Sequence, residues 1–228
     1  MKKRLKINGI IILVVLVSIA ILPSLFLRHK YQHSLDEFSE LFGIAFILLG
    51  QIFRVSARGY KSEYSQNGTV LIKGGPYSLV RNPMYLGILL IGVGIILILF
   101  RWWVLGLFLL IFISRYLSLI FEEEKRLLII FPEDYKDYFK KVTRLMPSIP
   151  MLLRNDIAEY LPLKLPWVKK EIGSMLGVLL PTLFLESWKD IYYEGIKFFL
   201  NELIFPVAVI ILFIYLVIYL LKRAERLG

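Results

Sequence analysis

The sequence predicts an all-α membrane protein: a polytopic transmembrane helical bundle of about six spans, with a tight helical hairpin and short cytoplasmic helices. Hydrophobic residues make up 57% of the 228 residues, and the mean hydropathy is +0.67. Both values are well above those of water-soluble domains. In addition, apolar runs that approach the ~20 residues needed to cross a bilayer core recur along the chain.

Six apolar segments are candidate spans. In chain order they are Ile10–Leu27, Leu41–Phe53, Met84–Phe100, Trp102–Phe121, Ile172–Leu185 and Leu203–Leu221. The first is interpreted as an anchor, because no small-residue cleavage pattern precedes Arg28. Only Arg101 separates the third and fourth segments, so we expect a hairpin with almost no loop. The fifth is short and contains Pro181, so a re-entrant or interfacial segment is the alternative to a full span.

The distribution of basic residues predicts that both termini lie in the cytoplasm, because Lys and Arg near span ends stay on that side. Six spans place 22 of the 28 basic residues inside and only 5 outside. Without the fifth span, Lys222, Arg223 and Arg226 would lie outside, so the count favours this span. We expect an integral protein of a bacterial or archaeal plasma membrane. Its net charge of +10 would face anionic lipid headgroups rather than nucleic acid.

Cysteine is absent from the chain, which excludes disulfides and thiolate chemistry. The two histidines, His29 and His33, have the spacing of one helical turn, but the nearest carboxylate is Asp36. We therefore expect them to be surface residues, and we expect no metal site.

Two segments on the predicted cytoplasmic side could carry chemistry, the loop 54–82 and the stretch 122–150, and the hairpin between them brings them together. Gly74-Gly75-Pro76 forms a turn where backbone could approach a ligand. Arg81 follows it and could clamp a carboxylate or phosphate, or anchor to lipid phosphate. Asn82-Pro83 predicts a capped helix start, whose unpaired N–H groups would also attract an anion.

Acidic residues dominate the start of the second segment. Glu122, Glu123 and Glu124 end the fourth apolar run, where both the helix dipole and anionic lipid disfavour negative charge, so they need partners. Arg115 lies seven residues before Glu122, on the same helical face. An arginine inside a membrane must face protein or a wet cavity. Either a structural pair with Glu122 or a role at the substrate or cofactor would satisfy this requirement.

Residues 131–141 predict a short helix, with proline and acids at its start and lysines at its end. Tyr135, Tyr138 and Phe139 form an aromatic stripe along it. Such a stripe serves either as an interfacial anchor or as a cover over a nucleoside.

Taken in order, five motifs mark the region from Leu41 to Pro150. They are Gly75-Pro76-Tyr77, Arg81-Asn82-Pro83-Met84-Tyr85, Glu123-Glu124-Lys125-Arg126-Leu127, Phe131-Pro132-Glu133-Asp134-Tyr135-Lys136-Asp137-Tyr138 and Arg144-Leu145-Met146-Pro147. Their order and spacing resemble the isoprenylcysteine carboxyl methyltransferase and phospholipid methyltransferase family of integral membrane enzymes. Two positions depart from the pattern. Asn82 replaces the histidine of the prenylcysteine enzymes, which disfavours their substrate, and Pro132 replaces a usual glycine.

The resemblance implies an S-adenosylmethionine-dependent methyltransferase that acts at the cytoplasmic face. Its acceptor would be a membrane-resident amphiphile, a lipid or isoprenoid with a carboxylate, amine or thiol. We expect Arg81, Glu124 and Arg115 to be catalytic. The cofactor would be bound by Gly75, Pro76, Tyr77, Arg81, Asn82, Pro83, Tyr85, Glu123, Glu124, Tyr135, Tyr138 and Arg144. The methyltransferase core would occupy 41–150, between an N-terminal span with its outer loop (1–40) and a C-terminal extension (151–228).

Two other functions compete with this interpretation. A nicotinamide-dependent membrane reductase of the sterol reductase type usually carries Tyr-Cys where this chain has Tyr138-Phe139. A membrane scaffold could keep the motifs as fold-determining sequence without catalysis. Binding of labelled cofactor to the purified protein separates these alternatives.

Overall fold

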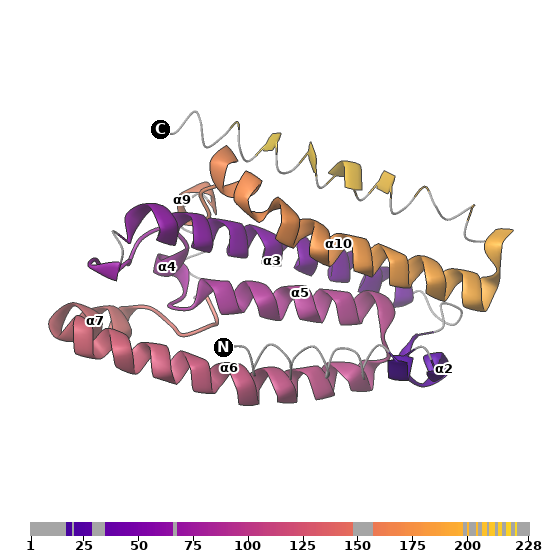
Figure 1. The fold of residues 1–228 in the computed structure, drawn as a ribbon, viewed down its shortest axis with the longest axis horizontal. Coiled ribbons are helices and arrows are strands. Elements are labelled where there is room, and N and C mark those ends of the chain that lie inside the picture. The colour runs from indigo at the N-terminus through magenta and orange to yellow at the C-terminus, as the bar shows by residue number, and fades with distance from the viewer. Residues whose placement is uncertain are drawn as a thin grey trace.

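The computed structural model describes residues 17–19, 21–28, 35–65, 68–147 and 157–197, together with scattered positions between 200 and 222. In these residues the regular structure is helical, apart from one bridge between Leu27 and Phe100, which confirms the all-α class. Four long helices run along one another (Figure 1). They are α3 (Leu35–Tyr64), α5 (Pro83–Leu99), α6 (Trp102–Ile130) and α10 (Leu165–Glu194).

The short helices lie at the two ends of this bundle (Figure 1). They are α2 (Pro23–Phe26), α4 (Pro76–Leu79), α7 (Pro132–Lys141) and α9 (Ile157–Tyr160). The short helix expected over 131–141 is confirmed as α7. Helices α4, α7 and α9 gather where α3 ends and α5 begins, whereas α2 lies at the opposite end, beside the link between α5 and α6.

Helices α3 and α5 make the closest contact in the bundle, because glycines face each other across it. A Cβ atom on Gly50 of α3 would lie 2.6 Å from the carbonyl oxygen of Gly87 of α5, and one on Gly94 would collide with the carbonyl of Gly43. Small residues at such positions let two backbones approach, which is how helices associate in lipid. This pair therefore forms the rigid centre of the bundle.

The hairpin of α5 and α6 is confirmed, since only Phe100 and Arg101 separate the two helices. Basic side chains satisfy the last carbonyl groups of α5. Arg28 donates from Nη2 to the oxygen of Leu97 (2.7 Å), and Lys189 donates from Nζ to that of Ile98 (3.5 Å). Cations are favoured at a helix C-terminus because the macrodipole is negative there.

Two of the described helices are long and apolar enough to cross a membrane, within Phe38–Tyr64 and Trp102–Ile130, while Pro83–Leu99 is apolar but shorter. The helix predicted over 41–53 continues to Tyr64, so the interpretation of 54–82 as a loop was wrong for its first part. Arg58 and Arg54 can remain helical there because α10 provides their partners. The structure describes only parts of the expected spans 10–27 and 203–221, and His29 and His33 lie outside the described residues.

Helix α10 extends well beyond the short segment expected over 172–185 and continues through Pro181. Polar contacts attach it to α3. Arg58 forms an ion pair with Glu171 (2.9 Å), Arg54 donates from Nη2 to Ser174 Oγ (2.9 Å), and the indole N–H of Trp167 donates to Glu63 (3.0 Å).

Candidate active site

The turn before α4 fixes the chain at the end of the bundle. Gly75 has a positive φ of 56°, which glycine tolerates without cost. A Cβ atom at Gly75 would lie 2.7 Å from the ring of Tyr60, so the glycine makes room for this α3 side chain. The turn is held from the other side by Tyr138 of α7, whose hydroxyl donates to the Tyr77 carbonyl (2.6 Å).

Helix α5 begins at Pro83 as expected, with Asn82 at the N-cap position, but the Asn82 side chain does not cap the helix. It donates instead from Nδ2 to the carbonyl of Arg144 (3.3 Å), and the Asn82 backbone N–H donates to the same oxygen (3.2 Å). The segment after α7 is thereby attached to the start of α5. The side-chain cap predicted from the Asn-Pro pair was wrong, because the side chain is oriented instead by its Nδ2 hydrogen bond to a carbonyl distant in sequence.

A buried carboxylate, Glu124 near the end of α6, joins the two sequence segments. It is only 7% exposed. Arg81 approaches Glu124 Oε1 with Nη2 (3.0 Å) and Nε (3.1 Å), and Arg144 approaches Oε2 with Nη2 (2.9 Å) and Oε1 with Nε (3.2 Å). Arg144 therefore contacts both carboxylate oxygens, the bidentate geometry of the strongest guanidinium pairs, whereas both Arg81 nitrogens contact Oε1. We call these three residues the Glu124 clamp.

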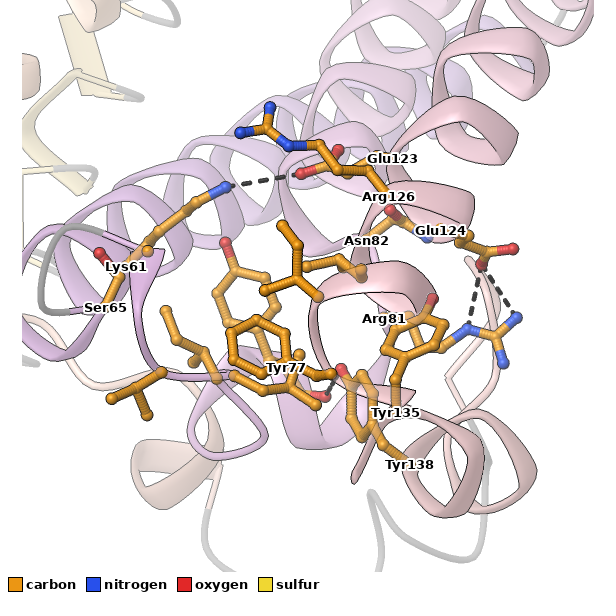
Figure 2. A pocket seen from close by; sticks show the side chains of 17 residues that line it. Lys61, Ser65, Tyr77, Arg81, Asn82, Glu123, Glu124, Arg126, Tyr135 and Tyr138 are labelled. Carbon is orange, nitrogen blue, oxygen red and sulfur yellow. Dashed lines mark hydrogen bonds and ion pairs between the residues drawn. The ribbon is translucent and has the colours of Figure 1, made fainter. Parts of the chain in front are cut away.

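Arg81 uses its remaining donors on the backbone after α7. Its Nη1 donates to the carbonyls of Phe139 (2.7 Å) and Val142 (3.2 Å), and its guanidinium lies 3.9 Å from the centre of the Phe139 ring. Figure 2 shows Arg81 and Glu124 turned toward each other at one side of the cavity. Arg81 therefore holds α7 in place through protein groups, and its role in binding a ligand carboxylate stays a prediction.

Glu123, the adjacent residue, lies in a different environment. Lys61 of α3 approaches its Oε1 at 3.5 Å, and the hydroxyl of Tyr85 approaches its Oε2 at 3.4 Å. The Lys61 and Glu123 side chains are 51% and 39% exposed. Both contacts are long, so this half-exposed carboxylate and ammonium can exchange partners with a ligand.

A cavity of about 370 Å³ opens between the end of α3, the start of α5, α6 and α7 (Figure 2). Its volume lies in the lower range of small-molecule sites. The polar lining consists of Lys61, Ser65, Asn82, Arg81, Glu123, Glu124 and Arg126. Apolar, aromatic and glycine lining comes from Gly68, Val70, Leu71, Ile72, Tyr77, Leu127, Ile130, Phe131, Tyr135 and Tyr138.

The tyrosines of α7 point inward. Tyr135 and Tyr138 are buried and meet edge to face, with ring centres 6.0 Å apart. Burial raises the pKa of Tyr135 to about 12 and raises the pKa of Tyr138 and Tyr77 still further above the ordinary value. These phenols stay protonated near neutral pH and act as walls and hydrogen-bond donors. The aromatic stripe was interpreted either as an interfacial anchor or as a cover. For Tyr135 and Tyr138 the structure favours the second interpretation, because both line the cavity.

The structure brings most of the expected site residues together, although not in one cavity. Pro83 and Tyr85 line a smaller cavity of about 190 Å³, which shares Lys61, Arg81 and Glu123 with the main one. Arg144 lines a third cavity of about 420 Å³ between α6 and α7. Gly75 and Pro76 support the turn but line none of the three.

Arg115 is not brought to this cluster. It lies exposed on α6, outside the lining of all three cavities. The neighbouring Tyr116 packs against Tyr85, with ring centres 5.4 Å apart. The catalytic role expected for Arg115 stays a prediction.

The site residues expected from the sequence did not include several lining residues, among them Lys61, the strip Val70 to Ile72, and Arg126. Arg126 stands inside the Glu-Glu-x-x-Leu motif, and its charge could have marked it. Lys61 was counted only among the basic residues of the cytoplasmic side, because the end of α3 was expected to be part of the loop 54–82. Among the described residues, no group of three or more His, Asp or Glu could hold a metal ion.

Residues 38–134 match the model described as phospholipid methyltransferase. Searches among curated proteins and among solved structures gave no match. The match covers α3, α4, α5 and α6 with their connections and ends at the start of α7, before Tyr135. Residues 38–134 are therefore similar to the phospholipid methyltransferase family, which confirms the resemblance indicated by the motifs.

Proposed function

We propose that this protein is an S-adenosylmethionine-dependent methyltransferase that acts on a membrane-resident amphiphile at the cytoplasmic face. The observation that carries the proposal is the 370 Å³ cavity, in which Glu123, Lys61 and Arg126 face apolar and aromatic walls. It is formed mainly by the segments that carry the family sequence.

The lining suits the parts of the cofactor, which supplies an activated methyl group. Its carboxylate needs a cation, available from Lys61 or Arg126, and its ammonium or ribose hydroxyls need a carboxylate, available from Glu123. Its adenine needs flat apolar walls, which Tyr135 and Phe131 offer at the α7 side. Arg81 and Glu124 satisfy each other and would contribute by holding these walls.

Methyl transfer is an in-line displacement with a positively charged leaving group, so positioning supplies much of the rate. Burial raises the pKa of the tyrosines that line the cavity, so they stay protonated near neutral pH and supply no phenolate to accept a proton. This disfavours an acceptor that must lose a proton of high pKa and favours a carboxylate, an amine or a thiolate.

The acceptor would arrive from the bilayer through the smaller cavity at Tyr85 and Met84, which lies at the start of α5 and shares Glu123 with the lining of the main cavity. The Tyr85–Tyr116 ring pair forms a wall between α5 and α6 there. Arg115 precedes Tyr116 in the chain but lines none of these cavities, so its interaction with the polar head of the acceptor stays a prediction.

Calorimetry with S-adenosylmethionine and purified protein in detergent tests the donor site. We expect saturable binding that weakens about tenfold or more in Glu123→Gln and Lys61→Gln, since hydrogen bonds to charged groups contribute about 1.5–3 kcal/mol. Lys73→Gln is the matched control, because Lys73 pairs with Asp134 outside the cavity. Absence of binding to the unaltered protein would refute the proposal. Mass spectrometry of lipid extracts, with and without the protein, identifies the methylated acceptor.

A further inference from the structure

A separate apolar cavity of about 350 Å³ lies between α3, α10 and the C-terminal residues. Aliphatic and methionine side chains form nearly all of its lining: Ile47, Leu48, Val168, Ile172, Met175, Leu176, Leu179, Ile210, Ile214 and Ile218. None of the described lining residues is charged. One side, α3, belongs to the segment that matches the family, whereas α10 and residues 210–218 lie outside it.

Gln51 is the one polar residue in the described lining. It is only 4% exposed, and the described part of the chain gives its side-chain amide no hydrogen bond. Its neighbour one turn along α3, Arg54, donates to Ser174 instead. The amide faces a cavity whose other described lining residues are apolar, and an amide without hydrogen bonds is unfavourable in such surroundings. Gln51 therefore has an unmet requirement for a polar ligand group.

The position of Gln51 excludes the methyl-transfer site as the source of this group. Ten helical residues separate Gln51 from Lys61, which corresponds to about 15 Å along α3 at 1.5 Å per residue. A molecule whose polar group reaches Gln51 cannot present the same group at Glu123. The occupant of this cavity is thus distinct from the methyl acceptor in its bound position.

We propose that this cavity binds a neutral long-chain alcohol, with the chain among the aliphatic side chains and the hydroxyl at Gln51. An amide both donates and accepts hydrogen bonds. A hydroxyl can accept from the amide N–H and donate to the amide oxygen, whereas a carbonyl can only accept. The uncharged lining excludes an ionised headgroup. The bound alcohol would attach the C-terminal extension to the family core.

Photolabelling of the full chain in lipid nanodiscs tests this inference. The probes are a diazirine-bearing hexadecanol, a prenyl alcohol of similar length with the same group, and a diazirine-bearing hexadecane without the hydroxyl. We expect one or both alcohols to label peptides of 47–51 and 168–179 at least fivefold more than the hydrocarbon. The preferred alcohol shows whether the site takes a saturated or an isoprenoid chain.

Two variants complete the test. Gln51→Leu should abolish the preference for the alcohols while hydrocarbon labelling stays the same. Leu176→Trp, which fills the cavity and leaves Gln51 intact, should reduce labelling by all probes, and Leu110→Trp on the exposed face of α6 should not. Equal labelling by alcohol and hydrocarbon, or an alcohol preference that survives Gln51→Leu, would overturn the inference. Binding of S-adenosylmethionine, measured in the same variants, should be unchanged and separates this result from the proposed function.

Discussion

The three adjacent glutamates at the end of α6 offer an internally controlled experiment, because each has a different environment. Glu122 is exposed, Glu123 is half-buried at the main cavity, and Glu124 is buried between two arginines. Replacing each by glutamine removes one charge and changes the shape of the side chain very little. We expect three different outcomes from the same chemical change.

For Glu124→Gln the expected loss is mainly one of stability. Removing one partner of a buried ion pair costs about 3–5 kcal/mol, because the remaining charge stays buried and uncompensated. Arg81 is 7% exposed and keeps two backbone carbonyls, whereas Arg144 is 32% exposed and regains water. These compensations lower the expected loss to about 2–3 kcal/mol. For a chain of this length, that is a fall of roughly 5–10 °C in the midpoint of thermal unfolding.

Scanning fluorimetry and calorimetry in the same detergent read stability and affinity for S-adenosylmethionine in parallel. Glu123→Gln should lose affinity with a nearly unchanged unfolding midpoint, and Glu122→Gln should change neither. Glu124→Gln should lower the midpoint of thermal unfolding, and its affinity for S-adenosylmethionine should fall only because the protein is less stable. An unchanged midpoint in Glu124→Gln, or an equal fall in Glu122→Gln, would refute the structural role assigned to the Glu124 clamp.

Three further outcomes are expected. Gly50→Ala should destabilise the protein by about 1–3 kcal/mol through overpacking against α5. Gly106→Ala should stabilise it by up to about 1 kcal/mol, because the added methyl group meets open space. Chemical unfolding measures the free energy of unfolding of both variants. The folded-state pKa of Tyr138 is raised above its unfolded value, so its contribution to stability is complete below about pH 10 and is lost as the pH rises further. Tyr138→Phe should therefore flatten the alkaline fall in the unfolding midpoint, and a fall as steep as in the unaltered protein would contradict this. Arg115→Leu should reduce turnover of a membrane acceptor more than affinity for the cofactor, and steady-state kinetics beside calorimetry would show the reverse if Arg115 bound the donor.

The sequence predicted the centres of the long helices but not their ends. The apolar run that predicted the second span ends before Arg54, yet helix α3 continues through Arg54, Arg58 and Lys61. Each of these side chains has a partner from a distant segment: Ser174, Glu171 and Glu123, respectively. No local pattern contains those partners, so a helix end that depends on them could not be located from the sequence alone.

The site shows the same division. The motif order predicted that the segments near Arg81 and Glu123-Glu124 meet, and they do. It could not assign the two glutamates, because consecutive residues on a helix point about 100° apart. Which one pairs with Lys61 and which one pairs with Arg144 depends on how α6 is rotated against its neighbours, and tertiary packing decides that rotation.

The strengths of the two ion pairs explain how one motif can serve both fold and chemistry. The pair of Lys61 and Glu123 is long and half-exposed, and such pairs contribute at most about 1 kcal/mol. A ligand that brings a carboxylate and an ammonium can replace it at little cost, since each side chain exchanges one opposite charge for another. The Glu124 clamp is buried and satisfied by several donors, so a ligand that separated it would leave charges without partners. A stable pair beside an exchangeable one keeps α7 over the cavity while the cavity itself stays able to bind.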